Sequence, residues 1–253
     1  MIDAAGKAGR SLLRGFGDIE SLQVSRKGPA DFVSEADRRA EKIIFETLQK
    51  ARPKYGFLME ERGEVAGEDI SNRWVVDPLD GTLNFLHGLP HFAVSIALER
   101  DGEPFAGVIY EPVSDQMFWA EKGQGAHLNG RRLRVSSRRD LSESVFATGI
   151  PFHGRDGHEP FLAQLAEVMA VSAGVRRFGA AALDLAYVAA GRYEGFWEQG
   201  LNPWDIAAGI VILREAGGTV SDFSGRKRMM ESGEIIASNG VLHEDLRRLL
   251  RKR

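Results

Sequence analysis

The sequence of 253 residues contains no cysteine. This absence excludes disulfide bonds, thiolate metal ligands and thiol nucleophiles, so any metal ligands are oxygens or imidazoles. The opening stretch, MIDAAGKAGRSLLRGFGD, lacks the apolar segment and the cleavage site of a secretory signal, and no window reaches about 18 apolar residues. We therefore expect a cytoplasmic protein that does not cross a membrane.

The chain also lacks a strong net charge. It has 33 Lys and Arg residues and 36 Asp and Glu residues, which gives a formal net charge of −3 and a pI near 6.1. Bulk attraction to nucleic acid or to an anionic membrane is therefore not indicated, and an anionic substrate has to be attracted locally. The composition is that of an ordinary globular protein, and we expect two packed halves without a linker, residues 1–140 and 141–253.

Hydrophobic periodicity predicts the main elements. Apolar residues at helical spacing indicate helices in the N-terminal stretch and over Ser34–Arg52, and the intervening SRKGPADF is predicted to be a mobile surface loop. The runs YGFLME and RWVVD read as strands that end in acids, and residues 92–128 alternate as an antiparallel meander. Helices and strands alternate in the second half, so the order predicts an α/β layered fold with mixed sheets between helices.

The segment DPLDGT, residues 77–82, places two acids three positions apart at the end of an apolar run. Such a pair is stable only when a cation, a shared proton or solvent offsets the repulsion. Asp77 and Asp80 could bind divalent cations, and the backbone N–H groups of Gly81 and Thr82, at the start of a short helix, could bind phosphate. An ordinary Asp-rich turn is the alternative interpretation.

Two further acids lie at the ends of predicted elements. Glu60 follows a strand in MEERG, and Asp205 lies one turn into an apolar helix in NPWDIAAG. Each alone could be a solvated acid or a complement to a helix dipole. Together with Asp77 and Asp80 they would form an unfavourable set without cations, and two or more Mg²⁺ ions would offset the repulsion and activate water.

The motifs DPLDGTLNF, MEE, AALDLAYVAAG and PWDIAAGIVILREAGG, in this order, resemble the inositol monophosphatase family of Mg²⁺-dependent, lithium-sensitive phosphatases. The resemblance covers essentially the whole chain. It implies an alternating αβαβα sandwich with mixed, largely antiparallel sheets, as in the inositol monophosphatase and fructose 1,6-bisphosphatase fold. It further implies a homodimer that hydrolyses inositol monophosphates, small phosphate monoesters, with a metal-activated water.

The resemblance also assigns roles to individual residues. Two to three Mg²⁺ ions would be held by the acids and one carbonyl oxygen: Glu60, Asp77, Leu79, Asp80 and Asp205. The attacking water would be oriented and activated by Asp37, Thr82 and Glu60. Phosphate would contact Gly81 and Thr82, and the rest of the substrate would contact Asp80, Ala181, Glu198 and Asp205. Lys27, in the predicted mobile loop, matches a lysine near the metals.

Alternatives stay open at this point. Many bacterial relatives have a serine where this chain has Ala180, which makes substrate preference harder to transfer. The same scaffold serves fructose 1,6-bisphosphate, histidinol phosphate and 3′-phosphoadenosine nucleotides. Some bacterial relatives associate with RNA polymerase and assist ribosomal RNA synthesis as antitermination factors. The basic segment RRLRVSSRR, residues 131–139, is the one feature in favour of that role or of nucleic-acid binding, and a solvated loop explains it as well.

Overall fold

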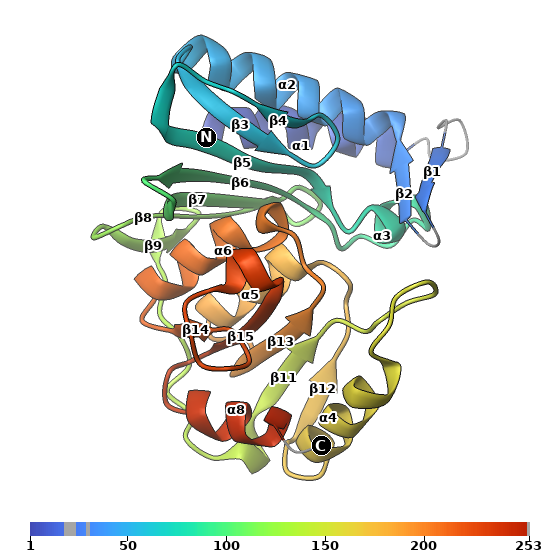
Figure 1. Ribbon diagram of the computed structural model, residues 1–253, viewed down its shortest axis with the longest axis vertical. Coiled ribbons are helices and arrows are strands. Elements are labelled where there is room, and N and C mark those ends of the chain that lie inside the picture. The colour runs from blue at the N-terminus through green and yellow to red at the C-terminus, as the bar shows by residue number, and fades with distance from the viewer. Residues whose placement is uncertain (18–23, 29–30, 252–253) are drawn as a thin grey trace.

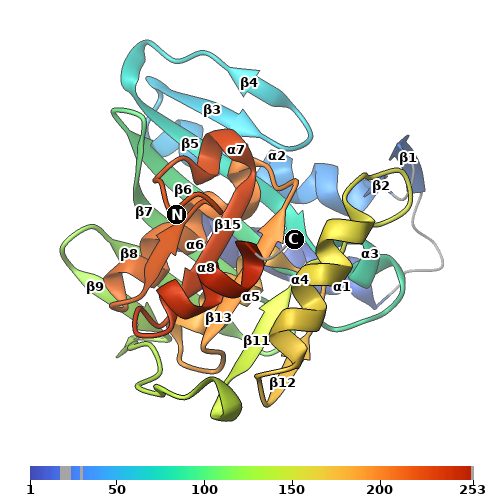
Figure 2. The same cartoon turned by 60° about the horizontal axis from the view of Figure 1, so that its bottom comes forward.

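The computed structural model describes residues 1–17, 24–28 and 31–251, with the backbone alone described for 24–28 and 31–34. Its elements stack in five layers, helices alternating with sheets (Figure 1). Helices α1 (Ile2–Phe16) and α2 (Glu35–Ala51) form the outer layer of the N-terminal half. Helices α5 (Ala181–Ala189) and α6 (Pro203–Glu215) lie between the sheets, and α4 (His158–Met169) and α8 (His243–Arg251) cover the far sheet (Figure 2).

The first sheet has eight strands and only one parallel pair, β3 with β5. In spatial order its strands are β10 (Arg131–Arg132), β9 (Gly125–Leu128), β8 (Gln116–Glu121), β7 (Glu103–Glu111), β6 (Ala93–Arg100), β5 (Asp69–Asp80), β3 (Tyr55–Met59) and β4 (Gly63–Val65). The short helix α3 (Thr82–Leu86) follows β5 directly. The expected meander is therefore present as β6 to β9.

The second sheet has five strands and is mixed. In spatial order they are β12 (Gly174–Arg176), β11 (Val145–Thr148), β13 (Gly195–Gln199), β15 (Glu234–Ser238) and β14 (Thr219–Ser221), with β11 parallel to both neighbours and the other pairs antiparallel. The short helices η2 (Leu141–Glu143) and α7 (Met229–Ser232) complete this half. The predicted αβαβα sandwich with mixed, largely antiparallel sheets is confirmed.

Two local predictions differ from the structure. The segment expected as a loop contains two strands, β1 (Val24–Gly28) and β2 (Asp31–Ser34), which pair antiparallel. The backbone N–H and C=O groups of each strand find hydrogen-bond partners in the other. Helix α2 agrees with the helix expected over Ser34–Arg52 to within one residue at each end. Strand β5 does not end at Asp77 but continues to Asp80, with a break in its register against β6 between those two residues.

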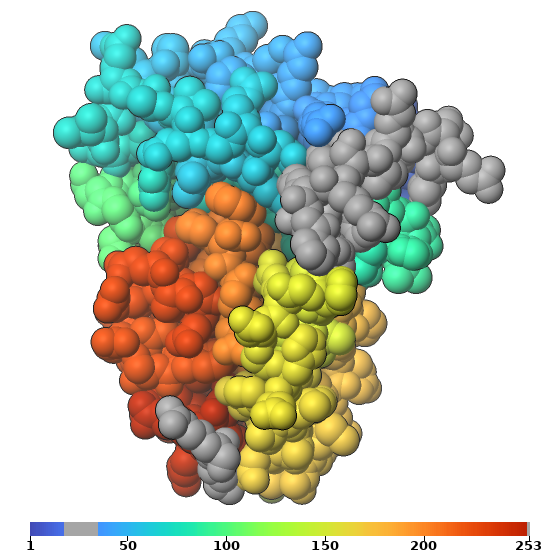
Figure 3. All heavy atoms as spheres, turned by 45° about the vertical axis from the view of Figure 1, so that its right-hand side comes forward, coloured from blue at the N-terminus to red at the C-terminus, as the bar shows by residue number. Residues whose placement is uncertain are grey.

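The central helices explain why the two halves form one body. All residues of α6 from Ile206 to Leu213 are buried, as expected for a helix that is apolar on every side. They pack in one core cluster with residues of both sheets, such as Ile109 and Phe196. Figure 3 shows the two halves stacked against each other, and the boundary near residue 140 stays a prediction. Within the described residues, no helix has the length and apolar character needed to cross a membrane.

A glycine marks the closest approach between the first sheet and α6. A Cβ atom on Gly107 of β7 would lie 2.5 Å from the carbonyl oxygen of Ala208 and 2.8 Å from its Cα. We expect Gly107→Ala to cost about 3 kcal/mol, since only backbone atoms stand in the way, and to lower Tm by roughly 6–12 °C in calorimetry. Gly6→Ala, in the interior of α1, is the control and should stabilise slightly; equal melting of the two variants would contradict the packing argument.

Candidate active site

A cavity of about 220 Å³ lies where the C-terminal end of β5 meets the second half of the chain. Strand β5, helix α3, the N-terminal ends of α5 and α6, the end of β13 and the loop after β11 surround it. Its walls include most of the residues predicted from the sequence, namely Glu60, Asp77, Leu79, Asp80, Gly81, Thr82, Ala181, Glu198 and Asp205. Asp37 lies directly behind Thr82, and Lys27 lies in β1, where the side chains are outside the description.

The two aspartates of DPLDGT are buried, with exposed fractions of 2% for Asp77 and 8% for Asp80. The N–H group of Leu79 donates to Oδ1 of Asp77 at 2.9 Å, which closes a tight turn within the strand. The N–H group of Ala182, in the first turn of α5, donates to Oδ2 of Asp80 at 2.9 Å. Asp80 therefore joins the first sheet to the N-terminus of a central helix, where the helix dipole favours a negative charge.

Thr82 connects the segment to α2. Its hydroxyl oxygen lies 3.0 Å from Oδ1 of Asp37 and 3.0 Å from the carbonyl oxygen of Leu79. A hydroxyl has one proton, so it donates to one of these acceptors at a time and its lone pairs are left to accept from another donor. Asp37 is fully buried in the first turn of α2. Gly81 has a φ of 89°, which lets the chain turn from strand into helix.

Asp205 and Glu198 come from the second half of the chain. Asp205 is the third residue of α6, and its Oδ2 accepts the N–H group of Asn202 at 2.7 Å, a capping contact at the helix start. Glu198 lies on β13 with its carboxylate over Gly149, where an added Cβ would come within 1.9 Å of the carboxyl carbon. The glycine at 149 lets the carboxylate lie directly against the backbone in this position.

Burial and mutual repulsion make these carboxylates weak acids. Burial, followed by the charges of Glu60 and Asp80, raises the pKa of Asp77 well above its usual range. Burial and the charge of Asp205 do the same to the pKa of Asp80. Burial raises the pKa of Asp205 to about 7, although the Asn202 N–H group opposes the shift. Burial and Asp205 raise the pKa of Glu198 to about 8.

The chemistry of this donor set fits Mg²⁺. The predicted ligands are carboxylate and carbonyl oxygens, which hard divalent cations prefer, and a cation among them would offset the repulsion. Among the residues that the structure describes, no three His, Asp or Glu side chains are yet arranged around one point as in a closed metal site.

Three further charged residues belong to this region, and the sequence analysis did not assign two of them, Arg155 and Asp184, to the site. Arg155 lines the cavity from the loop after β11, donates to the carbonyl oxygen of Gly200 at 2.7 Å and stacks 4.3 Å above the ring of Phe152. Arg177 also lines the cavity. Asp184 of α5 is 1% exposed, and its Oδ1 has no hydrogen-bond partner in the described part of the chain. Burial and Glu198 raise its pKa well above the usual range.

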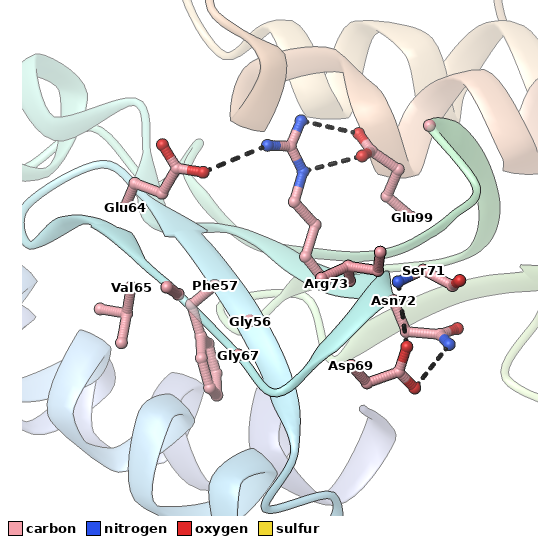
Figure 4. A pocket seen from close by; sticks show the side chains of 13 residues that line it. Gly56, Phe57, Glu64, Val65, Gly67, Asp69, Ser71, Asn72, Arg73 and Glu99 are labelled. Carbon is pink, nitrogen blue, oxygen red and sulfur yellow. Dashed lines mark hydrogen bonds and ion pairs between the residues drawn. The ribbon is translucent and has the colours of Figure 1, made fainter.

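A second hollow, of about 430 Å³, lies at the base of the β3–β4 hairpin (Figure 4). Its one arginine, Arg73, pairs with Glu99 at 2.7 Å and faces Glu64 at 3.8 Å, so its positive charge is already compensated. None of the acids with strongly raised pKa values lines it. The first cavity is therefore the candidate active site.

The comparisons with known proteins agree with this geometry. A model of the inositol monophosphatase family matches residues 1–253. The chain belongs to this family. An inositol-1-monophosphatase of Mesorhizobium japonicum is 59% identical over 252 residues, which span 100% of this chain and 95% of that protein. The Nus factor SuhB of Escherichia coli is 46% identical over 238 residues, or 94% of this chain and 89% of that protein.

A solved structure has the same fold as this chain. The crystal structure of the extragenic suppressor protein suhB from Bartonella henselae superposes with a TM-score of 0.98 at 59% sequence identity, covering 100% of this chain and 97% of that one. The family and the fold predicted from the sequence motifs are thus confirmed.

Proposed function

We propose that this chain is a Mg²⁺-dependent phosphomonoesterase that hydrolyses inositol monophosphates to inositol and phosphate. The observation that carries the proposal is the gathering of Asp77, Asp80 and Asp205 with Glu60 in one cavity, beside helix N-termini suited to an anion. The curated relatives named inositol-1-monophosphatase support the choice of substrate.

Two to three Mg²⁺ ions would be held by Glu60, Asp77, the carbonyl oxygen of Leu79, Asp80 and Asp205. Bound there, Mg²⁺ supplies positive charge for the phosphate oxygens and the leaving oxygen and lowers the pKa of water. The N–H groups of Gly81 and Thr82, which open α3, would donate to the phosphate, because the first N–H groups of a helix have no acceptor within it.

The chain's own residues would position the reactants. The Thr82 hydroxyl, held by Asp37, would accept a hydrogen bond from the attacking water and so orient it in line with the leaving oxygen. Glu60 would take part in activating that water. Asp80, Ala181, Glu198 and Asp205 would contact the polyol, with carboxylates accepting hydrogen bonds from its hydroxyls. A role for Lys27 in the metal region stays a prediction.

Phosphate release with and without Mg²⁺ tests the proposal on inositol 1-phosphate, fructose 1,6-bisphosphate, histidinol phosphate, 3′-phosphoadenosine 5′-phosphate and β-glycerophosphate. We expect inositol 1-phosphate to be preferred and chelation with EDTA to reduce its hydrolysis to background, because the carboxylates alone repel phosphate. Preference for another substrate of the panel would change the proposed substrate and leave the metal assignment in place. Mg²⁺-independent release would contradict the metal assignment itself.

One observation favours a second candidate, association with RNA polymerase: the Escherichia coli relative is named a Nus factor. All five arginines of the basic segment are exposed, namely Arg131, Arg132, Arg134, Arg138 and Arg139, and Arg138 also pairs with Glu194 at 2.9 Å. We propose catalysis as the main function. Co-purification of polymerase with a variant that lacks the metal-binding acids would support the second candidate. The expected homodimer and cytoplasmic location stay predictions, and light scattering at micromolar concentration tests the first of them.

A further inference from the structure

Helix α2 presents a row of residues, four positions apart, toward the active-site region. Asp37, Glu41 and Phe45 recur at the spacing that stacks side chains on one helix face. Asp37 is fully buried and holds Thr82, as described above. Glu41, one turn later, is only 4% exposed and is not among the residues that line the active-site cavity. A buried carboxylate is costly, so its contacts need an explanation.

The partners of Glu41 are backbone amides. Its Oε2 accepts the N–H groups of Glu61 at 2.9 Å and of Arg62 at 3.2 Å. The Arg62 guanidinium lies 3.8 Å from Oε1 and 4.2 Å from the centre of the Phe45 ring. Hydrogen bonds from amides to a charged acceptor are stronger than neutral ones and offset the cost of burying the carboxylate. Glu41 and Phe45 therefore hold a single turn of the chain, residues 60–62.

That turn joins β3 to β4 and begins with Glu60. The N–H group of Glu60 donates to the carbonyl oxygen of Val76 at 3.1 Å, directly before Asp77 in β5. The backbone around Glu60 is thus tied to β5 on one side and, through the next two amides, to Glu41 on the other. These contacts fix Glu60, a predicted metal ligand at the tip of the hairpin, against β5, the strand that carries Asp77 and Asp80.

The base of the same hairpin is anchored separately (Figure 4). Gly56 and Gly67 meet so closely that a Cβ atom on Gly67 would lie 2.3 Å from the backbone nitrogen of Gly56. Arg73 of β5 pairs with Glu99 of β6 and faces Glu64 of β4. Because the contact between Gly56 and Gly67 lies at the other end of the hairpin, a change at Glu41 should loosen the tip and leave the base in place.

We propose that Glu41 is a positioning residue that holds the turn of residues 60–62. Glu60 is then already in place when Mg²⁺ binds, and the turn does not have to become ordered on binding. The inference rests on the proposed role of Glu60 as a metal ligand. Residues that orient metal ligands change metal affinity about 10- to 100-fold when they are replaced. Glu41 acts through backbone amides, so its reach and its ability to accept hydrogen bonds matter more than its charge.

Three substitutions separate these properties. Glu41→Asp keeps the charge and shortens the reach, Glu41→Leu keeps the volume and removes the acceptor, and Glu41→Gln keeps reach and acceptor without the charge. Isothermal titration of Mg²⁺ into the metal-free full chain should show affinity weakened at least about 10-fold in the Asp and Leu variants and recovered to within about 3-fold of wild type in the Gln variant. Glu46→Gln, exposed on the same helix, is the control and should bind as wild type does.

The Mg²⁺ dependence of the reaction rate provides a second test of the positioning role. In Glu41→Asp, the Mg²⁺ concentration for half-maximal rate should rise by the same factor as the dissociation constant, while kcat at saturating Mg²⁺ stays within about 3-fold of wild type. If the Leu variant does not fold, the Asp and Gln variants decide the question. Wild-type Mg²⁺ affinity in Glu41→Asp, or equal loss in Asp and Gln variants, would overturn the inference.

The titration keeps this inference separate from the proposed function. A wild-type chain that binds Mg²⁺ but hydrolyses none of the phosphate esters would refute the proposed function, and the affinities of the Glu41 variants would still decide the positioning role. A wild-type chain that binds no Mg²⁺ would refute both.

Discussion

Replacement of Asp80 by asparagine is expected to lower turnover by at least about 10³-fold at saturating Mg²⁺, because a carboxylate is removed from the metal site and from the predicted contact with substrate. Asparagine has nearly the same shape, and its carbonyl oxygen can still accept the N–H group of Ala182. The loss of one charge also relieves repulsion with Asp205. We therefore expect the metal-free variant to melt at the same temperature as wild type or higher.

Steady-state phosphate release and thermal melting in EDTA measure both halves of this prediction. Asp101→Asn provides a matched control, since Asp101 is exposed in the turn after β6 and its φ of 52° suits asparagine. The control should retain turnover and stability. Turnover of Asp80→Asn near that of wild type would refute the metal assignment, and a large drop in metal-free stability would show that Asp80 matters mainly for folding.

The sequence was most informative where a site residue has a local signature. The proline, glycine and paired acids of DPLDGT predicted the central segment, and a first-turn proline identified the helix start that carries Asp205. These signals depend on backbone geometry within a few residues, so they can be read without a tertiary structure. That Asp205 lies near Asp77 follows from the packing of α6 against the first sheet. The sequence indicated this only indirectly, through the acids at the ends of predicted elements and through the family resemblance.

The parts that the sequence did not predict depend on distant contacts. Strand β11, residues Val145–Thr148, is too short to show a period, and parallel neighbours from elsewhere in the chain stabilise it. Arg155 lies in a loop with no periodicity at all. Glu41 stands one turn after Asp37 in a run of charged residues, RRAEK, where it reads as part of a solvated helix face. Its burial arises from the hairpin that closes over it.

The metal-free protein is expected to lose stability as pH rises from neutral to about 9. The folded-state pKa values of Asp205 and Glu198, about 7 and about 8, exceed those of an unfolded chain, so the folded state holds protons that the unfolded state has released. The free energy of unfolding therefore falls through this range, and the raised pKa values of Asp77, Asp80 and Asp184 act in the same direction. Burial also lowers the pKa values of the half-buried His91 and the buried His243. These histidines act in the opposite direction below about pH 7, so the measurement starts at neutrality.

Mg²⁺ should reverse this trend, because it binds the deprotonated carboxylates and its affinity rises with pH. At about pH 9 we expect saturating Mg²⁺ to raise Tm by about 10 °C over the EDTA form, and by much less at about pH 6, where the acids hold protons. Scanning calorimetry of wild type and Glu198→Gln at each pH isolates the contribution of one carboxylate, since glutamine cannot titrate. The EDTA slope of the variant should be shallower. An EDTA form that gains stability toward pH 9 would mean that these carboxylates are already ionised and separated without metal, and that repulsion does not shape the site.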